Sequence, residues 1–241
     1  SPATWANIYM VSVLVTGASR GIGLGLVKEL LKSNDVNLVI ATARQPEKAT
    51  ELKAISDKRL KIIQLTVDDD ESIKKAVAKT AEIVGNDGLD ILVNNSGVFK
   101  ALDPKHPVRA DMIEQLNVDV VSVAMLNAAM LPVLRKAVAR KGFAQIVSIS
   151  SLLGSSTLCY GNSHDFNNCA YNMGKAALNR YTCYVSKEWA DEKIRLTCLC
   201  PGWVKTDMGT QAAVFTVEDS TKMLAKNILA LDAEHNGQFL N

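Results

Sequence analysis

Short runs of apolar, β-branched residues recur along the chain, and stretches with apolar residues three or four positions apart lie between them. The apolar runs begin near residues 11, 37, 59, 89, 143 and 194. The helical patterns span 21–33, 46–55, 69–84, 107–139 and about 168–191. Strands that are apolar on both faces and alternate with helices are typical of a covered parallel sheet. The pattern predicts a doubly wound α/β (Rossmann) fold of about seven parallel strands with helices on both faces, residues 236–241 adding an edge strand.

Composition and charge narrow the class of protein. The regular alternation over 241 residues favours one domain, 1–241, with one large core. Lys and Arg number 27 against 25 Asp and Glu, and this near balance argues against nucleic acid or an anionic membrane as the main partner. The first residues lack a basic segment before their apolar run, which breaks at Thr16 and Gly17. We therefore expect neither a signal peptide nor a membrane span, and a cytoplasmic location.

The cysteines and histidines show no ligand spacing. There is no C-x-x-C pair, and the histidines are far apart in sequence. Buried free thiols in a reducing compartment are expected, rather than a disulfide framework or a metal site. The residues concerned are Cys159, Cys169, Cys183, Cys198, Cys200, His106, His164 and His235.

Ligands of doubly wound sheets bind where strands end, so the residues that follow each apolar run are the candidates for a binding site. Gly17, Gly21 and Gly23 follow the first strand and lead into a helix. Glycine permits a tight turn and close backbone approach, and the start of a helix favours negative charge. The turn predicts a dinucleotide site, although such turns also occur for structural reasons.

The end of the second strand indicates which dinucleotide binds. An acid there would accept a hydrogen bond from the ribose 2′-OH of NAD, but the chain has Ala43 and then Arg44. A guanidinium pairs with a 2′-phosphate, and Arg20 in the glycine-rich turn could approach from the other side. We therefore expect NADP(H), the alternative being that both arginines are only solvated.

One further feature concerns proton chemistry. Tyr171 and Lys175 are four residues apart in a helical pattern, so they share one face, with Cβ atoms about 6 Å apart. A free phenol has a pKa of about 10, and a nearby cation favours the phenolate. The pair could therefore act as an acid or base, although a surface lysine beside a half-buried tyrosine has the same spacing.

Taken in order, these motifs resemble the short-chain dehydrogenase/reductase family over residues 11–240. The fourth run ends in "NNSG", the fifth in "SISSLLG" and the sixth in "PGWVKT", and Tyr171-x-x-x-Lys175 lies between the last two. Finer features look most like the sniffer and C-factor group of NADPH-dependent carbonyl reductases. The resemblance implies that Tyr171 is the general acid, that Lys175 depresses the tyrosine pKa and holds the nicotinamide ribose, and that Ser151, in an S-x-x-G frame with Gly154, binds the substrate oxygen.

The resemblance also implies a set of cofactor contacts. Besides Tyr171 and Lys175, these are Gly17, Ser19, Arg20, Gly21, Ile22, Gly23, Arg44, Thr66, Val67, Asn94, Ser96, Gly97, Pro201, Gly202, Val204 and Thr206. Two positions depart from the family pattern, because Thr66 replaces an Asp and Ser96 an Ala. We expect both changes to reduce cofactor affinity without abolishing binding.

The resemblance also implies a fourth catalytic position, in the long helix predicted at 107–139. The family has an asparagine thirteen positions before a helix proline, and counting back from Pro132 gives Asp119. Asn117 is two residues away, which on a helix is about 200° of rotation, so it should face elsewhere unless the register slips. Asp119 is therefore the predicted residue and Asn117 the alternative.

The leading functional hypothesis is NADPH-dependent reduction of an apolar aldehyde or ketone. Apolar residues are expected around the nicotinamide, namely Leu152, Leu153, Trp203 and Phe215. The alternatives are NAD-dependent alcohol oxidation and a catalytically weak NADPH-binding signalling protein. Family relatives often pair through the helices here predicted at 107–139 and 168–191, so we expect a homodimer.

Overall fold

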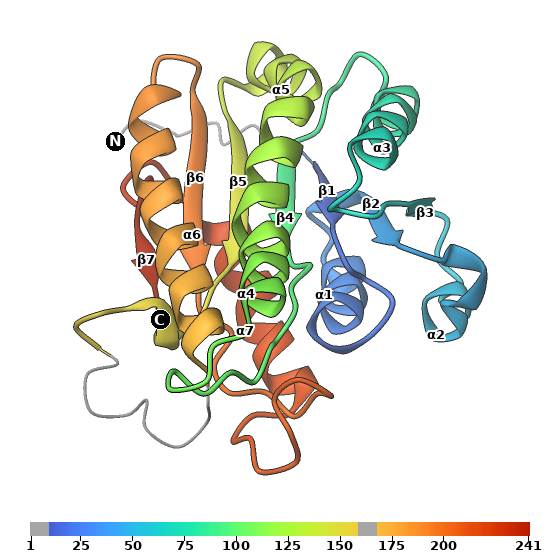
Figure 1. Ribbon diagram of the computed structural model, residues 1–241. Coiled ribbons are helices and arrows are strands. Elements are labelled where there is room, and N and C mark those ends of the chain that lie inside the picture. Colours follow the sequence, from blue (N-terminus) through green and yellow to red (C-terminus); the bar gives the residue numbers. More distant parts are fainter. Residues whose placement is uncertain (1–9, 159–167) are drawn as a thin grey trace, which may run out of the picture.

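Seven parallel strands form one sheet in the order β3-β2-β1-β4-β5-β6-β7 (Figure 1). The structure is a computed structural model that describes residues 10–158 and 168–241. The strands are β1 Val11–Val15, β2 Val36–Ala43, β3 Leu60–Gln64, β4 Ile91–Asn94, β5 Ala144–Ile149, β6 Ile194–Leu199 and β7 Phe239–Leu240. The doubly wound parallel sheet predicted from the sequence is confirmed, including the edge strand near residue 240.

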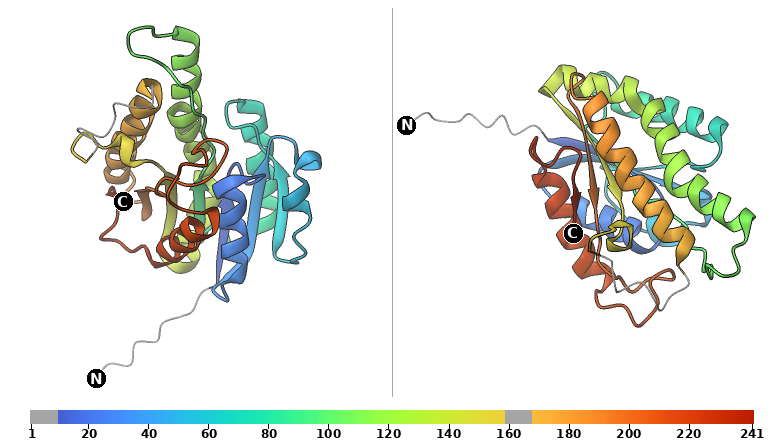
Figure 2. Two further views of the ribbon diagram at one scale, coloured as in Figure 1. Left: turned by 90° about the horizontal axis from the view of Figure 1, so that it is seen from below. Right: turned by 60° about the vertical axis from the view of Figure 1, so that its left-hand side comes forward.

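Two layers of helices enclose the sheet (Figures 1 and 2). One layer contains α1 Gly21–Lys32, α2 Thr50–Lys53 and α7 Val217–Ala230, and the other contains α3 Asp70–Val84, α4 Arg109–Leu116, α5 Ser122–Lys141 and α6 Cys169–Glu188. Alternate residues of β1 face opposite layers, because Val13 and Val15 pack with α1 while Leu14 packs with α5. Burial on both faces explains why the strands are continuous apolar runs.

Two predicted helices differ from those observed. The single helix predicted over 46–55 is wrong, because a 3-10 turn at Pro46–Lys48 and the short α2 replace it. Ala49 lies between them outside helical geometry (φ −80°, ψ 66°), and the bend lets Ala49 and Leu52 both pack into the core. The long helix predicted at 107–139 is present as α4 and α5, but a π-helical turn at Asn117–Val121 joins them.

The α4–α5 segment is long and apolar enough to cross a membrane by composition, with a mean hydropathy of 1.6 over 18 residues. Its inward face packs on the sheet through Leu126, Met130 and Leu134, each at most 1% exposed. A core position therefore accounts for much of its apolar character, and 44% of that window is buried within the fold.

The described cysteines are free, as predicted, but only one of them is fully buried. Cys198 is buried in β6, and burial raises the pKa of its thiol to about 11. Cys169, Cys183 and Cys200 are half-buried. Cys159 and His164, which entered the expectations above, lie outside the described residues.

Candidate active site

The ends of the central strands bring the predicted site residues to one edge of the sheet. Thr16 follows β1, Asn94 ends β4, Ser150 follows β5 and Cys200 follows β6. Strands β1 and β4 are neighbours without being consecutive, so the strand order reverses between them. Ligands of doubly wound sheets bind at such a reversal, outside the carboxyl ends of the strands.

The glycine-rich turn is fastened to the end of β4. Asn95 donates from its side-chain amide to the carbonyl oxygens of Thr16 (2.8 Å) and Gly17 (3.2 Å), and Thr16 Oγ1 accepts from the N–H groups of Asn95 and Ser96. Gly17 has a positive φ of 63°, and a β-carbon there would lie 2.8 Å from Ser96 Oγ. A β-carbon at Gly23 would overlap Gly17 and Asn95. Contacts within the protein therefore require these two glycines, whatever the ligand.

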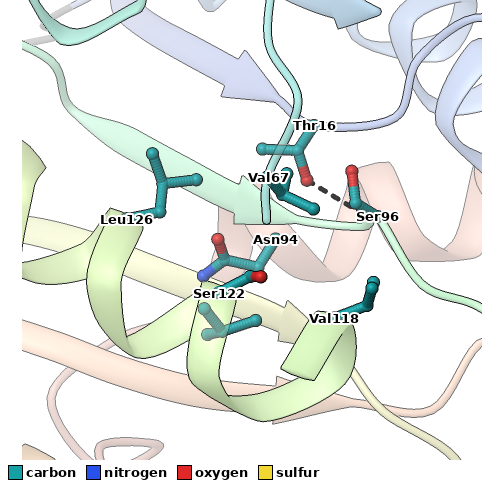
Figure 3. Close-up of a pocket in the computed structure, with 8 residues that line it drawn as sticks. Thr16, Val67, Asn94, Ser96, Val118, Ser122 and Leu126 are labelled. Atoms are coloured by element: carbon teal, nitrogen blue, oxygen red, sulfur yellow. Dashed lines mark hydrogen bonds between the residues drawn. The ribbon is translucent and has the colours of Figure 1, made fainter. Parts of the chain in front are cut away.

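A small cavity of about 10 Å³ lies between the ends of β1 and β4 and the start of α5 (Figure 3). It is lined by Thr16, Val67, Asn94, Ser96, Val118, Ser122, Val123 and Leu126. The structure thus brings together three residues predicted to contact the cofactor: Val67, Asn94 and Ser96. The side chain of Asn94 is turned toward α5, where its amide nitrogen donates to Asn127 Oδ1 at 2.9 Å.

A larger cavity, of about 490 Å³, lies between the glycine-rich turn and the end of β2. It is lined by Ser19, Arg20, Ala43, Arg44, Gln45, Lys48, Ala49, Thr50 and Glu51. Three cations and one carboxylate line it, which suits an anion. Arg20 pairs with Asp207 at 2.9 Å, but both side chains are more than 70% exposed, so the pair contributes about 1 kcal/mol at most. Lys48 was not predicted from the sequence.

Tyr171 and Lys175 lie one turn apart near the start of α6, beside the end of β5. The Nζ atom of Lys175 lies 5.4 Å from the centroid of the Tyr171 ring. It also donates a hydrogen bond of 3.1 Å to the carbonyl oxygen of Ile149, and only 6% of Lys175 is exposed. The structure therefore places the predicted pair together, with the ammonium group buried.

The two adjacent serines after β5 have different surroundings. Ser150 is buried, and its hydroxyl donates to Asn179 Oδ1 at 2.6 Å. Ser151 is half-buried and lies close enough to Tyr171 for a side-chain hydrogen bond that lowers the tyrosine pKa. A β-carbon on Gly154 would lie 2.6 Å from the Lys175 carbonyl carbon, so only glycine lets this turn approach α6 so closely. The geometry favours Ser151 over Ser150 for substrate contact.

Asp119 lies on the π-helical turn, and in the described part of the chain it is the carboxylate that contacts Lys175. Its Oδ2 atom lies 3.6 Å from Lys175 Nζ, and the residue is 1% exposed. Gly97 and Gly174 lie against it, because β-carbons there would come within 3.2 and 3.3 Å of its carboxylate oxygens. The position counted from Pro132 is therefore the one that faces the lysine.

Electrostatics in this group favour a protonated tyrosine. Burial raises the pKa of Tyr171, Lys175 lowers it and Asp119 raises it again, and the result is above the ordinary value. Burial lowers the pKa of Lys175, but Asp119 and Tyr171 raise it by more, so it too ends above its ordinary value. Lys175 lowers the pKa of the phenol, in the direction expected from the sequence, but burial and Asp119 raise it by more.

The remaining predicted residues follow strands β3, β4, β5 and β6 or lie at the start of α1. Val204 is buried and forms a bridge with Phe215, whose ring lies over Gly202, and Trp203 donates from its indole N–H to the Gly209 carbonyl at 2.6 Å. Thr206 Oγ1 accepts from the Gly209 N–H. The others are Ile22, Gly97, Thr66, Leu152, Leu153 and Pro201, all half-buried, and Gly21, whose φ is 55°.

Phe99 is an apolar contact of Tyr171 that the sequence analysis missed. Its ring meets the Tyr171 ring edge-on, with 5.4 Å between centroids and 63° between planes. It is 36% exposed, so an apolar surface beside the tyrosine is open to solvent.

The strand reversal, the fastened glycine-rich turn and the tyrosine–lysine–serine group are together the arrangement expected of an oxidoreductase on a doubly wound sheet. The family model described as short chain dehydrogenase matches residues 11–214, and the chain belongs to that family.

Similar solved structures share this architecture. The putative carbonyl reductase Sniffer of Caenorhabditis elegans is 41% identical, with 95% of each chain covered and a TM-score of 0.86. Carbonyl reductase Sniffer of D. melanogaster is 33% identical (96% of each chain, TM-score 0.90). An NADPH-bound carbonyl reductase from chicken fatty liver is 37% identical (95% of each chain, TM-score 0.90).

Proposed function

We propose that this protein is an NADPH-dependent reductase that converts an apolar aldehyde or ketone to the alcohol. The observation that carries the proposal is the buried contact of Tyr171 with Lys175, with Ser151 beside the phenol, at the end of β5. The likeness to carbonyl reductases from worm, fly and chicken supports the reaction class, and the chicken enzyme's bound NADPH supports the cofactor.

The residues present fit NADP(H). Arg44 and Lys48 line the large cavity with Arg20, and the second strand ends without an acid. We assign Arg44 and Lys48 to the 2′-phosphate, and the N–H groups of the glycine-rich turn to the pyrophosphate. When bound, NADPH supplies the hydride.

The protein supplies the proton. Tyr171 donates its hydroxyl proton to the carbonyl oxygen of the substrate, and the Ser151 hydroxyl hydrogen-bonds the same oxygen. Because the pKa of Tyr171 is raised, the phenol is protonated at neutral pH, as reduction requires and as alcohol oxidation does not. General acid catalysis of this kind contributes about 100- to 10,000-fold in rate.

The substrate surface is proposed to be apolar. Phe99 contacts Tyr171 directly, Leu152 and Leu153 lie in the turn that carries Ser151, and Trp203 is 41% exposed on the loop after β6. Such surfaces favour carbonyl compounds with hydrocarbon or aromatic substituents over charged sugars or acids.

The test is loss of NADPH absorbance when purified protein is mixed with a panel of aldehydes and ketones. Turnover is expected with apolar carbonyls, and Tyr171→Phe should lower kcat by at least about 100-fold while leaving NADPH affinity within a few-fold. Tyr181→Phe is the matched control, because Tyr181 lies further along α6 beside Asn127. If no carbonyl is turned over while NADPH binds tightly, the proposal is wrong and a binding role is favoured.

We also propose that the protein is a homodimer in the cytoplasm, paired through α4–α5 and α6. Large apolar side chains face outward on these helices, including Ile113 (60% exposed), Val121 (50%), Met125 (46%) and Tyr184 (55%). Burying such a surface against a second copy would stabilise the pair. Light scattering at the mass of one chain, 26.1 kDa, would contradict the dimer.

A further inference from the structure

Gln115, near the end of α4, is fully buried and joins two parts of the candidate active site. It is 0% exposed. Its Nε2 atom donates to the Val98 carbonyl oxygen at 2.7 Å and to Asp119 Oδ2 at 2.8 Å, and its Oε1 atom accepts from the Lys100 N–H at 2.8 Å. Both ends of the carboxamide are therefore engaged within the protein.

The main chain fixes the orientation of this carboxamide. The Lys100 N–H can only donate, so the atom that meets it is the oxygen Oε1. The Val98 carbonyl can only accept, so the other end is the donor Nε2. The second N–H of Nε2 then points at Asp119, whose Oδ2 must accept. The Val98 N–H donates to the other oxygen, Oδ1, at 3.4 Å, so both carboxyl oxygens of Asp119 accept hydrogen bonds.

The same side chain fixes the segment that carries Phe99. Gln115 bonds the residue before Phe99 and the residue after it, so both flanks of the aromatic residue are held to α4. Phe99 contacts the ring of Tyr171, while Asp119 contacts Lys175 at 3.6 Å. One buried amide thus supports both the apolar wall beside the phenol and the anion beside the lysine.

We propose that Gln115 is a positioning residue for carbonyl reduction, which holds the Asp119 carboxylate toward Lys175 and holds Phe99 against Tyr171. The proposal rests on the proposed function. Gln115 acts through these neighbours and is not itself assigned a contact with substrate or cofactor.

Removal of the amide should change the charge beside the lysine. Without the Gln115 donor, the carboxylate of Asp119 is no longer held toward Lys175 and can turn away from the pair. Asp119 raises the pKa of Tyr171, so displacement of its charge should lower that pKa. Burial is the largest cause of the raised Tyr171 pKa, and release of Phe99 would lessen it, so both effects of the change act in the same direction. Lys175, the Ser151 hydroxyl and Cys200 also act on Tyr171, and a change at residue 115 leaves these groups in place.

The test compares Gln115→Met, Asp119→Asn and the double variant, with Gln145→Met as the matched control. Gln145 is also buried, at 3% exposed, but it lies near the start of β5, away from the site, and its amide donates to the Ile228 carbonyl of α7. The Tyr171 pKa is read from ultraviolet difference spectra against Tyr171→Phe in each background, which needs no turnover. NADPH affinity, kcat and KM are measured with one bulky and one small apolar ketone.

Gln115→Met is expected to lower the Tyr171 pKa, as Asp119→Asn does, and the double variant should lower it by less than the sum of the two single shifts, because both substitutions act on the same carboxylate. With the bulky ketone, kcat/KM should fall about tenfold, mainly through KM, because Phe99 is no longer held. NADPH affinity and the Gln145→Met profile should stay unchanged. An unchanged or raised Tyr171 pKa, or additive shifts in the double variant, would overturn the positioning role. An unmodified protein that reduces no ketone would instead overturn the proposed function.

Discussion

Replacing Arg44 with alanine is expected to weaken NADPH binding by about 10- to 150-fold and to leave NADH binding nearly unchanged. Arg44 and Lys48 line the cavity at the end of β2, and neither forms an ion pair with another residue in the described part of the chain. Neither must give up a partner to meet a phosphate. A hydrogen bond to a charged group contributes about 1.5–3 kcal/mol, and a loss of that size raises Kd by about 10- to 150-fold.

Arg20 provides the internal comparison for this prediction. It lies in the same cavity but is paired with Asp207 at 2.9 Å on the surface. That exposed pair is weak, so Asp207→Asn should change NADPH affinity by about fivefold at most. The assay is a titration of each variant with NADPH and NADH by calorimetry at fixed salt. Equal weakening of both cofactors by Arg44→Ala, or weakening of neither, would refute the assignment of the 2′-phosphate to this cavity.

Three further substitutions follow from the structure. Asp119→Asn should lower the pH at which alcohol oxidation becomes efficient, because Asp119 raises the pKa of Tyr171, and should leave reduction near neutral pH little changed. Identical pH–rate profiles for oxidation in the mutant and the parent would contradict this. Gly154→Ala should lower the free energy of unfolding by about 1–3 kcal/mol and also lower kcat, because the added β-carbon would lie 2.6 Å from the Lys175 main chain. An unchanged midpoint of denaturant unfolding would show that the turn can shift freely. Burial lowers the pKa of Lys141 below its usual 10.5, so between those two pKa values the lysine is protonated in the unfolded chain and neutral in the folded protein. The free energy of unfolding of the parent should therefore rise with pH across this interval relative to that of Lys141→Met, and parallel curves of this free energy against pH would contradict a cost of burying the charge.

The sheet and the central chemical pair could be predicted from the sequence because both depend on local patterns. Apolar runs buried on both faces identify parallel strands wherever they occur, and the spacing of Tyr171 and Lys175 places them on one face of a helix. The prediction failed where local pattern and burial disagree. Residues 46–55 have the composition of a helix, yet the chain bends at Ala49 as it packs into the core.

The missed site residues depend on contacts between distant segments. Gln115 meets Val98 seventeen residues away, and Phe99 reaches Tyr171 across the site, so no local spacing identifies either. One long-range contact does follow from the sequence. The amides of "NNSG", Asn94 to Gly97, can hold the turn after the fourth run, and in the structure the Asn95 side chain fastens the glycine-rich turn.

The π-helical turn at Asn117–Val121 has a consequence for how insertions and deletions are tolerated. Its closing hydrogen bond runs from the Ser122 N–H to the Asn117 carbonyl, five residues back rather than four. That extra residue sets the rotational phase of α4, which carries Gln115, independently of α5, which packs Leu126 and Met130 on the sheet. Deleting one residue of the turn would restore a plain α-helix but rotate one half by about 100° against the other. The helix would gain regularity, and either the core or the catalytic group would lose its alignment.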